Sequence, residues 1–183
     1  MQAHRDRAQL LLVDVQQMLV PHVTDHVRIV ANCARLIGYA RCMGVPITVS
    51  EHVPGSIGPT ISELAELLGN ASRLEKVECS CWRNPGLQGR LSQLRREGRR
   101  QVVVAGMEAH VCVGQTVLDL IAHEFDVFLV ADAVGSRSPE VRELALRRLE
   151  QAGAALVSHE MVAFEWLGRA DVPEFRDVLR LLK

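Results

Sequence analysis

Short apolar runs recur along the chain at residues 8–13, 45–50, 102–105, 127–131 and 154–158, with a weaker run at 73–77. Runs of this length, rich in Val, Leu and Ala, are typical of strands buried on both faces of a parallel sheet. Between the runs, apolar residues recur every three or four positions, which predicts helices over 24–43, 60–68, 87–97, 111–121, 138–149, 161–167 and 173–182. The chain therefore alternates strands with helices.

This alternation predicts an α/β fold of the doubly wound, Rossmann-like kind. We expect a six-stranded parallel sheet in the order 3-2-1-4-5-6, with helices on both faces in a three-layer sandwich. Thr24 and Ser138 are the expected N-caps of two helices, with Pro139 in the first position of the second. Residues 53–59, rich in Pro and Gly, read as a loop at the mouth of a site. Residues 1–183 are expected to form a single domain.

Composition narrows the class of function. The formal net charge is −1, which gives no indication of a nucleic-acid partner or of binding to a membrane surface. The apolar run at 10–13 is too short for a signal peptide, and no run approaches the length that spans a bilayer. Five cysteines, an odd number, favour reduced thiols and a cytoplasmic location.

Three polar residues stand at or just after the ends of predicted strands: Asp14, Lys76 and Cys112. Each has an ordinary structural interpretation, since Asp14 could cap a turn, Lys76 could point to solvent and Cys112 could be a small buried hydrophobe. In the predicted strand order, however, the first and fourth strands are neighbours, so Asp14 and Cys112 should meet across the switch point. The helix predicted to begin at Cys112 should favour the thiolate there.

Acyl transfer through a thioester needs this combination of groups. A sulfur attacks a carbonyl carbon, a carboxylate shuttles the proton, and an ammonium group orients the carboxylate. Backbone N–H groups at a helix start can hold the oxyanion that forms. The trio therefore favours acyl transfer, and we expect a small-molecule substrate.

Several segments together resemble the isochorismatase-like cysteine hydrolases, a superfamily related to the nicotinamidases. They are Asp14-x-Gln16 after the first strand, Lys76 with Ser80, the run Gly106-x-Glu-Ala-His-Val-Cys112-Val, and Asp132-Ala133 with Ser136-Arg137. The Glu-Ala-His-Val-Cys-Val motif and the segment Ile57-Gly-Pro-Thr60 are most similar to the YcaC-type and isochorismatase-domain-containing branch of this superfamily. The resemblance covers nearly the whole chain.

The resemblance implies roles for these residues. Cys112 would be the nucleophile, Asp14 the general base and acid, and Lys76 the ion-pair partner of Asp14. A cis peptide bond just before Glu108 would let the N–H groups of Glu108 and Cys112 form an oxyanion hole. Glu108 stands where many amidases carry Thr, and a homo-oligomer is expected.

Three further residues are candidates for the substrate pocket: Gln16, His52 and Trp82. An exposed loop position for His52 and a packing role for Trp82 are the ordinary alternatives. Metal-binding relatives carry Asp-x-His and a second His after the second strand, whereas this chain offers Glu51-His52, so we predict no metal and no cofactor. Cys79-x-Cys81 lacks a second pair with zinc-ligand spacing.

Hydrolysis of a C–N bond in a small amide or related compound is the predicted reaction. Two alternatives stay open. One is isochorismate-type hydrolysis of a vinyl ether, which depends more on a general acid than on a thiol. The other is a non-catalytic oligomeric protein or a thiol-redox protein, in which Cys79 or Cys81 would resolve an oxidised Cys112.

Overall fold

The computed structural model describes residues 1–182 and contains one six-stranded sheet. All strand pairs are parallel and the order is β3-β2-β1-β4-β5-β6, which confirms the predicted topology. The strands are β1 (Ala8–Val13), β2 (Ile47–His52), β3 (Ser72–Lys76), β4 (Gln101–Met107), β5 (Asp126–Gly135) and β6 (Ala155–Val157). The two central strands, β1 and β4, are fully buried along their length, as continuous apolar runs require.

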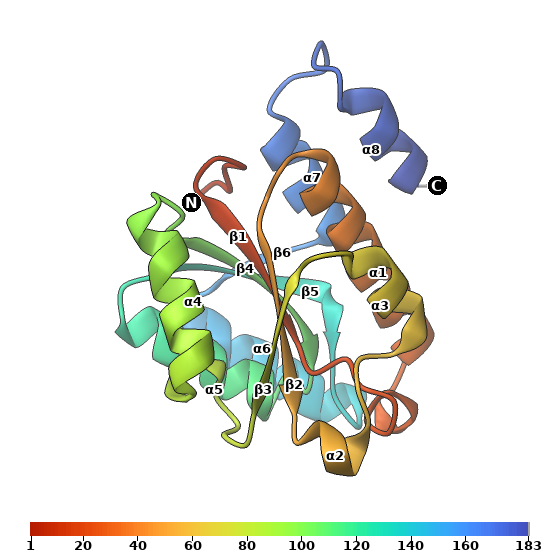
Figure 1. Ribbon diagram of the computed structural model, residues 1–183, viewed down its shortest axis with the longest axis vertical. Helices are drawn as coiled ribbons and strands as arrows, with labels where there is room; N and C mark the ends of the chain where they lie inside the picture. The colour runs from red at the N-terminus through yellow and green to blue at the C-terminus, as the bar shows by residue number, and fades with distance from the viewer. Residues whose placement is uncertain (183) are drawn as a thin grey trace.

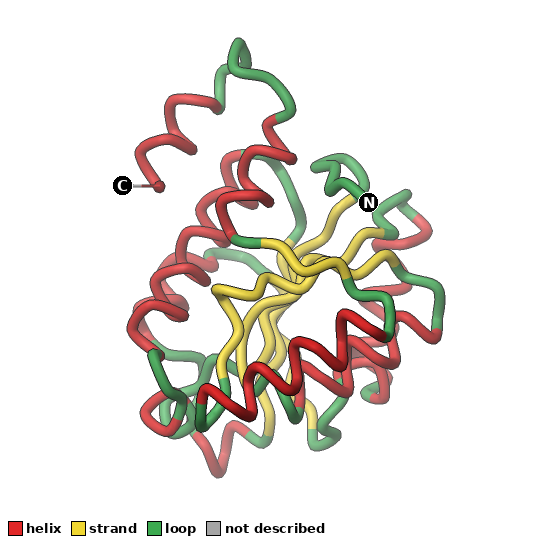
Figure 2. Tube along the Cα trace, turned by 180° about the vertical axis from the view of Figure 1, so that it is seen from behind, coloured by secondary structure: helices red, strands yellow, loops and turns green. Residues whose placement is uncertain are grey.

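Helices cover both faces of the sheet (Figures 1 and 2). One face carries α1 (His26–Cys42), α3 (Ser62–Leu68), α7 (His159–Leu167) and α8 (Phe175–Leu182), and the other carries α4 (Pro85–Arg96), α5 (Cys112–Ala122) and α6 (Pro139–Gln151). Each face has its own buried apolar cluster. The one-turn helix α2 (Pro54–Ile57) and the 3-10 turns η1 (Val20–His22) and η2 (Cys81–Arg83) complete the described elements.

The carboxyl ends of the strands meet at one edge of the sheet, near α2 in Figure 1. The N-terminus and α8 lie at the opposite edge. Since residues that follow parallel strands gather at the same edge, this is where Asp14, Lys76 and the start of α5 come together.

The structure corrects some local predictions. Thr24 does not cap α1; Asp25, in a left-handed conformation, precedes that helix, and the Thr24 hydroxyl instead donates to the carbonyl of Arg137 at 2.8 Å. The predicted loop at 53–59 contains α2. Strand β5 runs on to Gly135 because its register with β4 shifts between Val104 and Gly106, which accommodates extra residues. Ser138 does cap α6, with Pro139 as its first residue.

Gly106 allows β4 to lie unusually close to β1. Its φ is +121°, and a Cβ atom added there would come within 2.0 Å of the carbonyl oxygen of Val13. Only glycine fits a position with that approach and that dihedral angle. This close contact lies one residue before Asp14, so it fixes the separation between the ends of β1 and β4.

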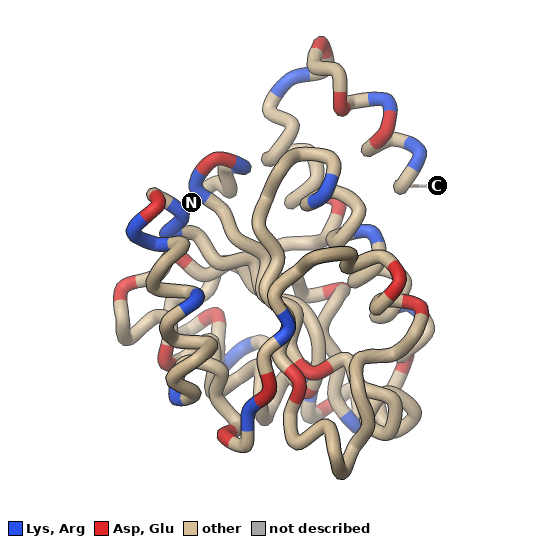
Figure 3. The backbone as a smooth tube through the Cα atoms, viewed as in Figure 1, with Lys and Arg blue, Asp and Glu red and all other residues tan. Residues whose placement is uncertain are grey.

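Acidic and basic residues are both spread along the whole trace (Figure 3). Within residues 1–182, no helix combines the length and the apolarity that crossing a bilayer requires.

Candidate active site

Asp14 directly follows β1 and is fully buried. Its φ of +48° is in the left-handed region, which Asp tolerates better than most residues. The backbone N–H of Asp14 donates to the carbonyl of Ser50, and the Ser50 hydroxyl donates to Asp14 Oδ1 at 2.6 Å. Lys76 Nζ donates to the other carboxylate oxygen, Oδ2, also at 2.6 Å. Both oxygens therefore have a short hydrogen bond, as a buried carboxylate requires.

Lys76 is the last residue of β3, and neither its side chain nor that of Asp14 is exposed. Burial alone lowers the pKa of Lys76, but the charge of Asp14, with smaller contributions from Cys81 and Cys112, raises it above the ordinary value. The ammonium group is therefore held in its charged form by the carboxylate beside it.

Cys112 is the first residue of α5 and is 7% exposed. Burial raises the pKa of its thiol well above the ordinary value, and the charge of Asp14 and a side-chain hydrogen bond to that carboxylate raise it further, while Lys76 acts in the opposite direction. This direction is opposite to the one expected from the helix start, because burial disfavours the charged form of the thiol.

The turn between β4 and α5 leads the chain into Cys112. The peptide bond between Met107 and Glu108 is cis, as the family resemblance implies. The Glu108 carbonyl accepts from the N–H groups of Val111 and Val113. Among residues 1–182, no backbone acceptor is found for the N–H groups of Glu108 and Cys112 themselves. These two donors remain available to another acceptor at this turn.

The loop after β5 holds this turn through three contacts. The N–H of Ala109 donates to the carbonyl of Gly135 at 2.7 Å, and His110 Nδ1 lies 3.0 Å from the hydroxyl of Ser136. Arg137 donates through Nε and Nη2 to the two carboxylate oxygens of Glu108, at 2.9 and 3.2 Å. These contacts of Ser136 and Arg137, and the contact of Ser50 with Asp14, were not predicted from the sequence. The sequence feature that could have indicated a role for Ser50 is its position, as a hydroxyl side chain at the end of an apolar strand.

Backbone groups bind the Gln16 side-chain amide. It donates to the carbonyls of His52 and Gly58, at 3.0 and 2.6 Å, and accepts from the His52 N–H at 2.7 Å. It therefore fastens the segment after β2 to the segment after β1. The Trp82 ring packs against Phe125 and His123, with ring centroids 5.3 and 4.7 Å apart, and its role as a pocket wall stays a prediction.

His52 is partly buried and pairs with Lys76 in the sheet. Its Nδ1 is buried, and within residues 1–182 it has no hydrogen-bond partner. An unpaired buried nitrogen normally has a water or a ligand as its partner. Unlike the Gln16 amide, His52 therefore keeps a buried polar atom without a partner among the described residues.

Two cavities flank the strand ends that carry Asp14 and Cys112. One, of about 270 Å³, is lined by residues that follow β2 and β3: Val53, Pro54, Gly55, Glu75, Lys76, Val77 and Asn84. The other, of about 390 Å³, is lined by Leu19, His22 and Arg137. Neither set includes Cys112 itself, so its thiol is reached only through the small part that is exposed.

The remaining thiols are not joined to Cys112. All five cysteines are free, and Cys33 and Cys81 are buried. Burial raises the pKa of Cys81 to about 11 and that of Cys33 to about 12. No group of three or more His, Cys, Asp or Glu side chains in the described chain is arranged to hold a metal ion.

The all-parallel sheet in the order 3-2-1-4-5-6 places this chain among the doubly wound α/β proteins, which bind ligands at the carboxyl ends of their strands. The family model described as the isochorismatase domain matches residues 8–161. The chain therefore belongs to the isochorismatase family.

The comparisons with known proteins agree. Isochorismatase domain-containing protein 1 from Danio rerio is 35% identical over 93% of this chain, which spans 59% of the length of that relative. The structure of MAR1 ribonuclease from Caenorhabditis elegans is 32% identical, with a TM-score of 0.92 over all of this chain and 92% of its own. The YcaC gene product from Escherichia coli, described as an octameric hydrolase of unknown specificity, is 25% identical, with a TM-score of 0.86 over 98% of this chain and 95% of its own.

Proposed function

We propose that this protein is a cysteine hydrolase that cleaves the C–N bond of a small amide or related compound through a thioester. The observation that carries the proposal is the fully buried Asp14 carboxylate, which Lys76 and Ser50 hold and whose charge adds to burial in raising the pKa of the Cys112 thiol. A neutral thiol beside a positioned base is the arrangement that general-base activation requires.

In the first half-reaction, Asp14 takes the proton from Cys112 as Sγ attacks the substrate carbonyl carbon. The carbonyl oxygen becomes an oxyanion, for which the N–H groups of Glu108 and Cys112 are the proposed donors. Asp14 then returns the proton to the leaving nitrogen, the C–N bond breaks, and an amine or ammonia leaves behind a thioester on Cys112.

In the second half-reaction, Asp14 removes a proton from water, which attacks the thioester carbonyl. The C–S bond breaks, the sulfur recovers a proton from Asp14, and the carboxylic acid is released. Lys76 stays charged throughout and fixes the orientation of the carboxylate. His52, whose Nδ1 is free, is the proposed contact for a polar group of the substrate.

Ammonia release from a panel of small amides, ureido compounds and carbamoyl acids tests the proposal. We expect turnover by the wild-type chain, and a loss of about 100- to 10,000-fold in kcat for Asp14→Asn, since that is the range of general-base contributions. Intact-protein mass spectrometry should detect an acyl adduct that Cys112→Ala cannot form and that the matched thiol variant Cys79→Ala retains. An adduct that persists in Cys112→Ala would contradict the assignment.

Hydrolysis of a vinyl ether is a second candidate, because the matching family model bears the name isochorismatase. That reaction needs protonation of a double bond by Asp14 rather than attack by sulfur. It would therefore survive in Cys112→Ala and fail in Asp14→Asn, which separates the two candidates.

Cleavage of RNA is a third possibility, which comes from the description of the Caenorhabditis elegans neighbour as a ribonuclease. The charge of this chain, −1 overall, does not favour it, because backbone phosphates are bound chiefly by clustered Lys and Arg. Incubation with single-stranded RNA belongs in the same panel, with Asp14→Asn as its control.

We also propose that the chain works as a homo-oligomer of one domain, for which the octameric Escherichia coli relative is the support. A reducing, cytoplasmic location is proposed from the five free cysteines.

A further inference from the structure

The cavity of about 390 Å³ lies between the segment that follows β1 and the loop that follows β5. Leu19 and His22 line it from the first segment, and Arg137 lines it from the second. Two hydrogen bonds join these walls. The N–H of Thr24 donates to the Ser136 carbonyl at 3.0 Å, and the Thr24 hydroxyl donates to the Arg137 carbonyl at 2.8 Å. The fold therefore holds the two walls of this cavity at a fixed separation.

Arg137 is the cation of this cavity, and its charge is already balanced by the protein. A free guanidinium group binds a carboxylate through two parallel hydrogen bonds. Here Nε and Nη2 of Arg137 make that pair of bonds to the two oxygens of Glu108, at 2.9 and 3.2 Å. The Glu108 side chain is only 5% exposed, so the carboxylate is built into the turn between β4 and α5. A carboxylate on a ligand would have to compete with it.

The other cation of the candidate site is balanced in the same way. Lys76 Nζ lies 2.6 Å from Asp14 Oδ2, and neither side chain is exposed. Lys76 and Arg137 thus each have a carboxylate as partner. A ligand carboxylate gives up hydration when it enters a cavity, and it needs a cation to compensate for that loss. The balanced charges therefore favour a ligand without a charge of its own.

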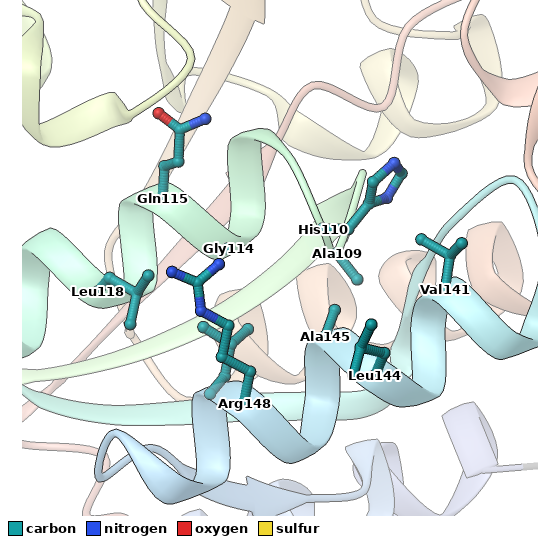
Figure 4. Close-up of a pocket in the computed structure, with 10 residues that line it drawn as sticks. Ala109, His110, Gly114, Gln115, Leu118, Val141, Leu144, Ala145 and Arg148 are labelled. Carbon is teal, nitrogen blue, oxygen red and sulfur yellow. The ribbon is translucent and has the colours of Figure 1, made fainter.

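The groove on the other side of the same turn does not change this balance. Ala109 and His110 line that groove, which runs between α5 and α6 (Figure 4). Its arginine, Arg148, lies about two helical turns beyond Val141 along α6. In Figure 4, the guanidinium group of Arg148 lies beside Gly114 and away from His110. The charge of this arginine is therefore not brought to the turn.

We propose that Glu108 determines the charge of the substrate: by occupying the guanidinium group of Arg137, it makes the site select an uncharged amide over one that carries a carboxylate. This role rests on the proposed function, because it takes the reacting carbonyl to lie at the turn that carries Glu108. Specificity of this kind comes from an element that disfavours the wrong ligand. If Glu108 loses its charge, Arg137 becomes free to bind a carboxylate, and the preference should shift toward anionic compounds.

Alkylation of Cys112 by two reagents that differ in charge tests this selection without turnover. Iodoacetamide is an uncharged amide, and iodoacetate is an anion of nearly the same size. Peptide mass spectrometry gives the ratio of the two rates at Cys112, and the exposed Cys42 on α1 gives a reference ratio in the same sample. In the wild type, we expect the ratio at Cys112 to favour iodoacetamide about tenfold more than the ratio at Cys42 does, the effect of one uncompensated charge.

Variants of the pair assign this preference to its source. Glu108→Gln keeps the size of the side chain and the backbone N–H, and it should shift the ratio at Cys112 toward iodoacetate by about 10- to 100-fold, the range for a hydrogen bond to a charged group. Adding Arg137→Met should cancel that shift, because the cation is then absent. Glu78→Gln is the matched control. Its carboxylate accepts from the Asn84 amide at 3.1 Å, so its loss frees no arginine and should leave the ratio in place.

Three results would overturn the selection by charge. They are a wild type that favours iodoacetate at Cys112, an unchanged ratio in Glu108→Gln, and a shift that persists after Arg137→Met is added. A Cys112 that neither reagent alkylates would also overturn it, because the cavity would then not lead to the thiol. The wild-type ratio remains a test even if a variant fails to fold.

Kinetics with matched amides separate this selection from the proposed function. Oxamide, malonamide and succinamide are uncharged, and oxamate, malonamate and succinamate carry a carboxylate in place of one amide. We expect kcat/KM to be higher for the uncharged member of a pair and Glu108→Gln to reduce that difference at least tenfold. Ammonia release without a preference would reject the selection by charge and leave the proposed function standing. If none of the six releases ammonia, hydrolysis of small amides is contradicted, while the alkylation ratios still decide the selection by charge.

Discussion

Two acid–base pairs stand at the same edge of the sheet, and they differ in how water reaches them. Asp14 and Lys76 are 2.6 Å apart, and neither side chain is exposed. Glu108 and Arg137 are 2.9 Å apart, but the Arg137 side chain is 69% exposed. The first pair lies beside the thiol of Cys112 and changes its pKa, whereas the second holds the turn that leads to Cys112. The two pairs therefore differ in role: the buried pair of Asp14 and Lys76 acts on the pKa of Cys112, and the pair of Glu108 and Arg137 holds the loop.

The largest effect is expected from breaking the buried pair. Lys76→Met leaves the Asp14 carboxylate buried with only Ser50 as its side-chain donor, and removing one partner of a buried ion pair costs about 3–5 kcal/mol of folding free energy. Arg137→Met removes a partner that is 69% exposed but leaves the Glu108 carboxylate, which is 5% exposed, without its donor, so the cost should lie between about 1 kcal/mol for an exposed pair and the cost of the fully buried pair. Urea denaturation at pH 7 measures both. Equal losses in the two variants would mean that burial does not distinguish the pairs.

Removing Asp14 and removing Lys76 should shift the pKa of Cys112 in opposite directions. Asp14→Asn removes a charge and a hydrogen-bond acceptor that raise the pKa, so the pKa should fall; Lys76→Met removes a charge that lowers it, so the pKa should rise. The rate of Cys112 alkylation by iodoacetamide against pH, followed by peptide mass spectrometry, measures both shifts. Glu108→Gln is the control and should leave the profile in place. Two shifts of the same sign would contradict the geometry.

A buried thiol that lies far from both pairs should make the free energy of unfolding fall at alkaline pH. The pKa of Cys33 rises from 9.0 to about 12 on folding, so the unfolded chain releases this proton at a lower pH than the folded chain. The stabilisation is complete below pH 9.0 and is lost as the pH rises toward the folded-state pKa. At pH 10 the loss from this group should be about 1 kcal/mol.

Cys33→Ala isolates that contribution, because the small cavity it leaves costs the same at every pH. The decrease in unfolding free energy between pH 8 and pH 10, from urea titrations, should be smaller in the variant than in the wild type. If the unfolding free energy decreases equally in the variant and the wild type, groups other than Cys33 cause the loss of stability at alkaline pH.

The smallest effect should come from the exposed pair itself. A double-mutant cycle with Glu108→Gln and Arg137→Met should give a coupling of about 0.5–1 kcal/mol, the usual range for a partly exposed pair. A coupling above 2 kcal/mol would mean that the Arg137 side chain is far less hydrated than its exposure indicates.

Sequence patterns were sufficient to predict the fold and some of the residues of the candidate site. The apolar runs predicted the strands, and the strand order placed Asp14 next to the β4–α5 turn, as β1 and β4 are paired along their length. The family resemblance is confirmed by the match over residues 8–161. The catalytic roles of Asp14, Lys76 and Cys112 remain predictions, which the experiments above test.

The sequence could not predict contacts between side chains that lie far apart in the chain and have several possible partners. Ser50 reaches Asp14 across 36 positions, and Arg137 reaches Glu108 across 29. The Ser136-Arg137 motif marked this arginine as part of the family resemblance, but nothing near it in the chain named Glu108 as its partner. The partners of Trp82, the rings of Phe125 and His123, lie 43 and 41 positions further along the chain, so no local pattern could name them.

The amino-acid sequence by itself determined the order of strands and helices and, through it, which strand ends share an edge, because periodicity and turn residues act over a few positions. Tertiary structure alone decided that burial raises the pKa of the Cys112 thiol, and that the charge of Asp14 more than offsets burial and raises the pKa of Lys76. Those properties depend on how much water the assembled layers exclude and on which charges they enclose, and no single segment of the chain carries that information.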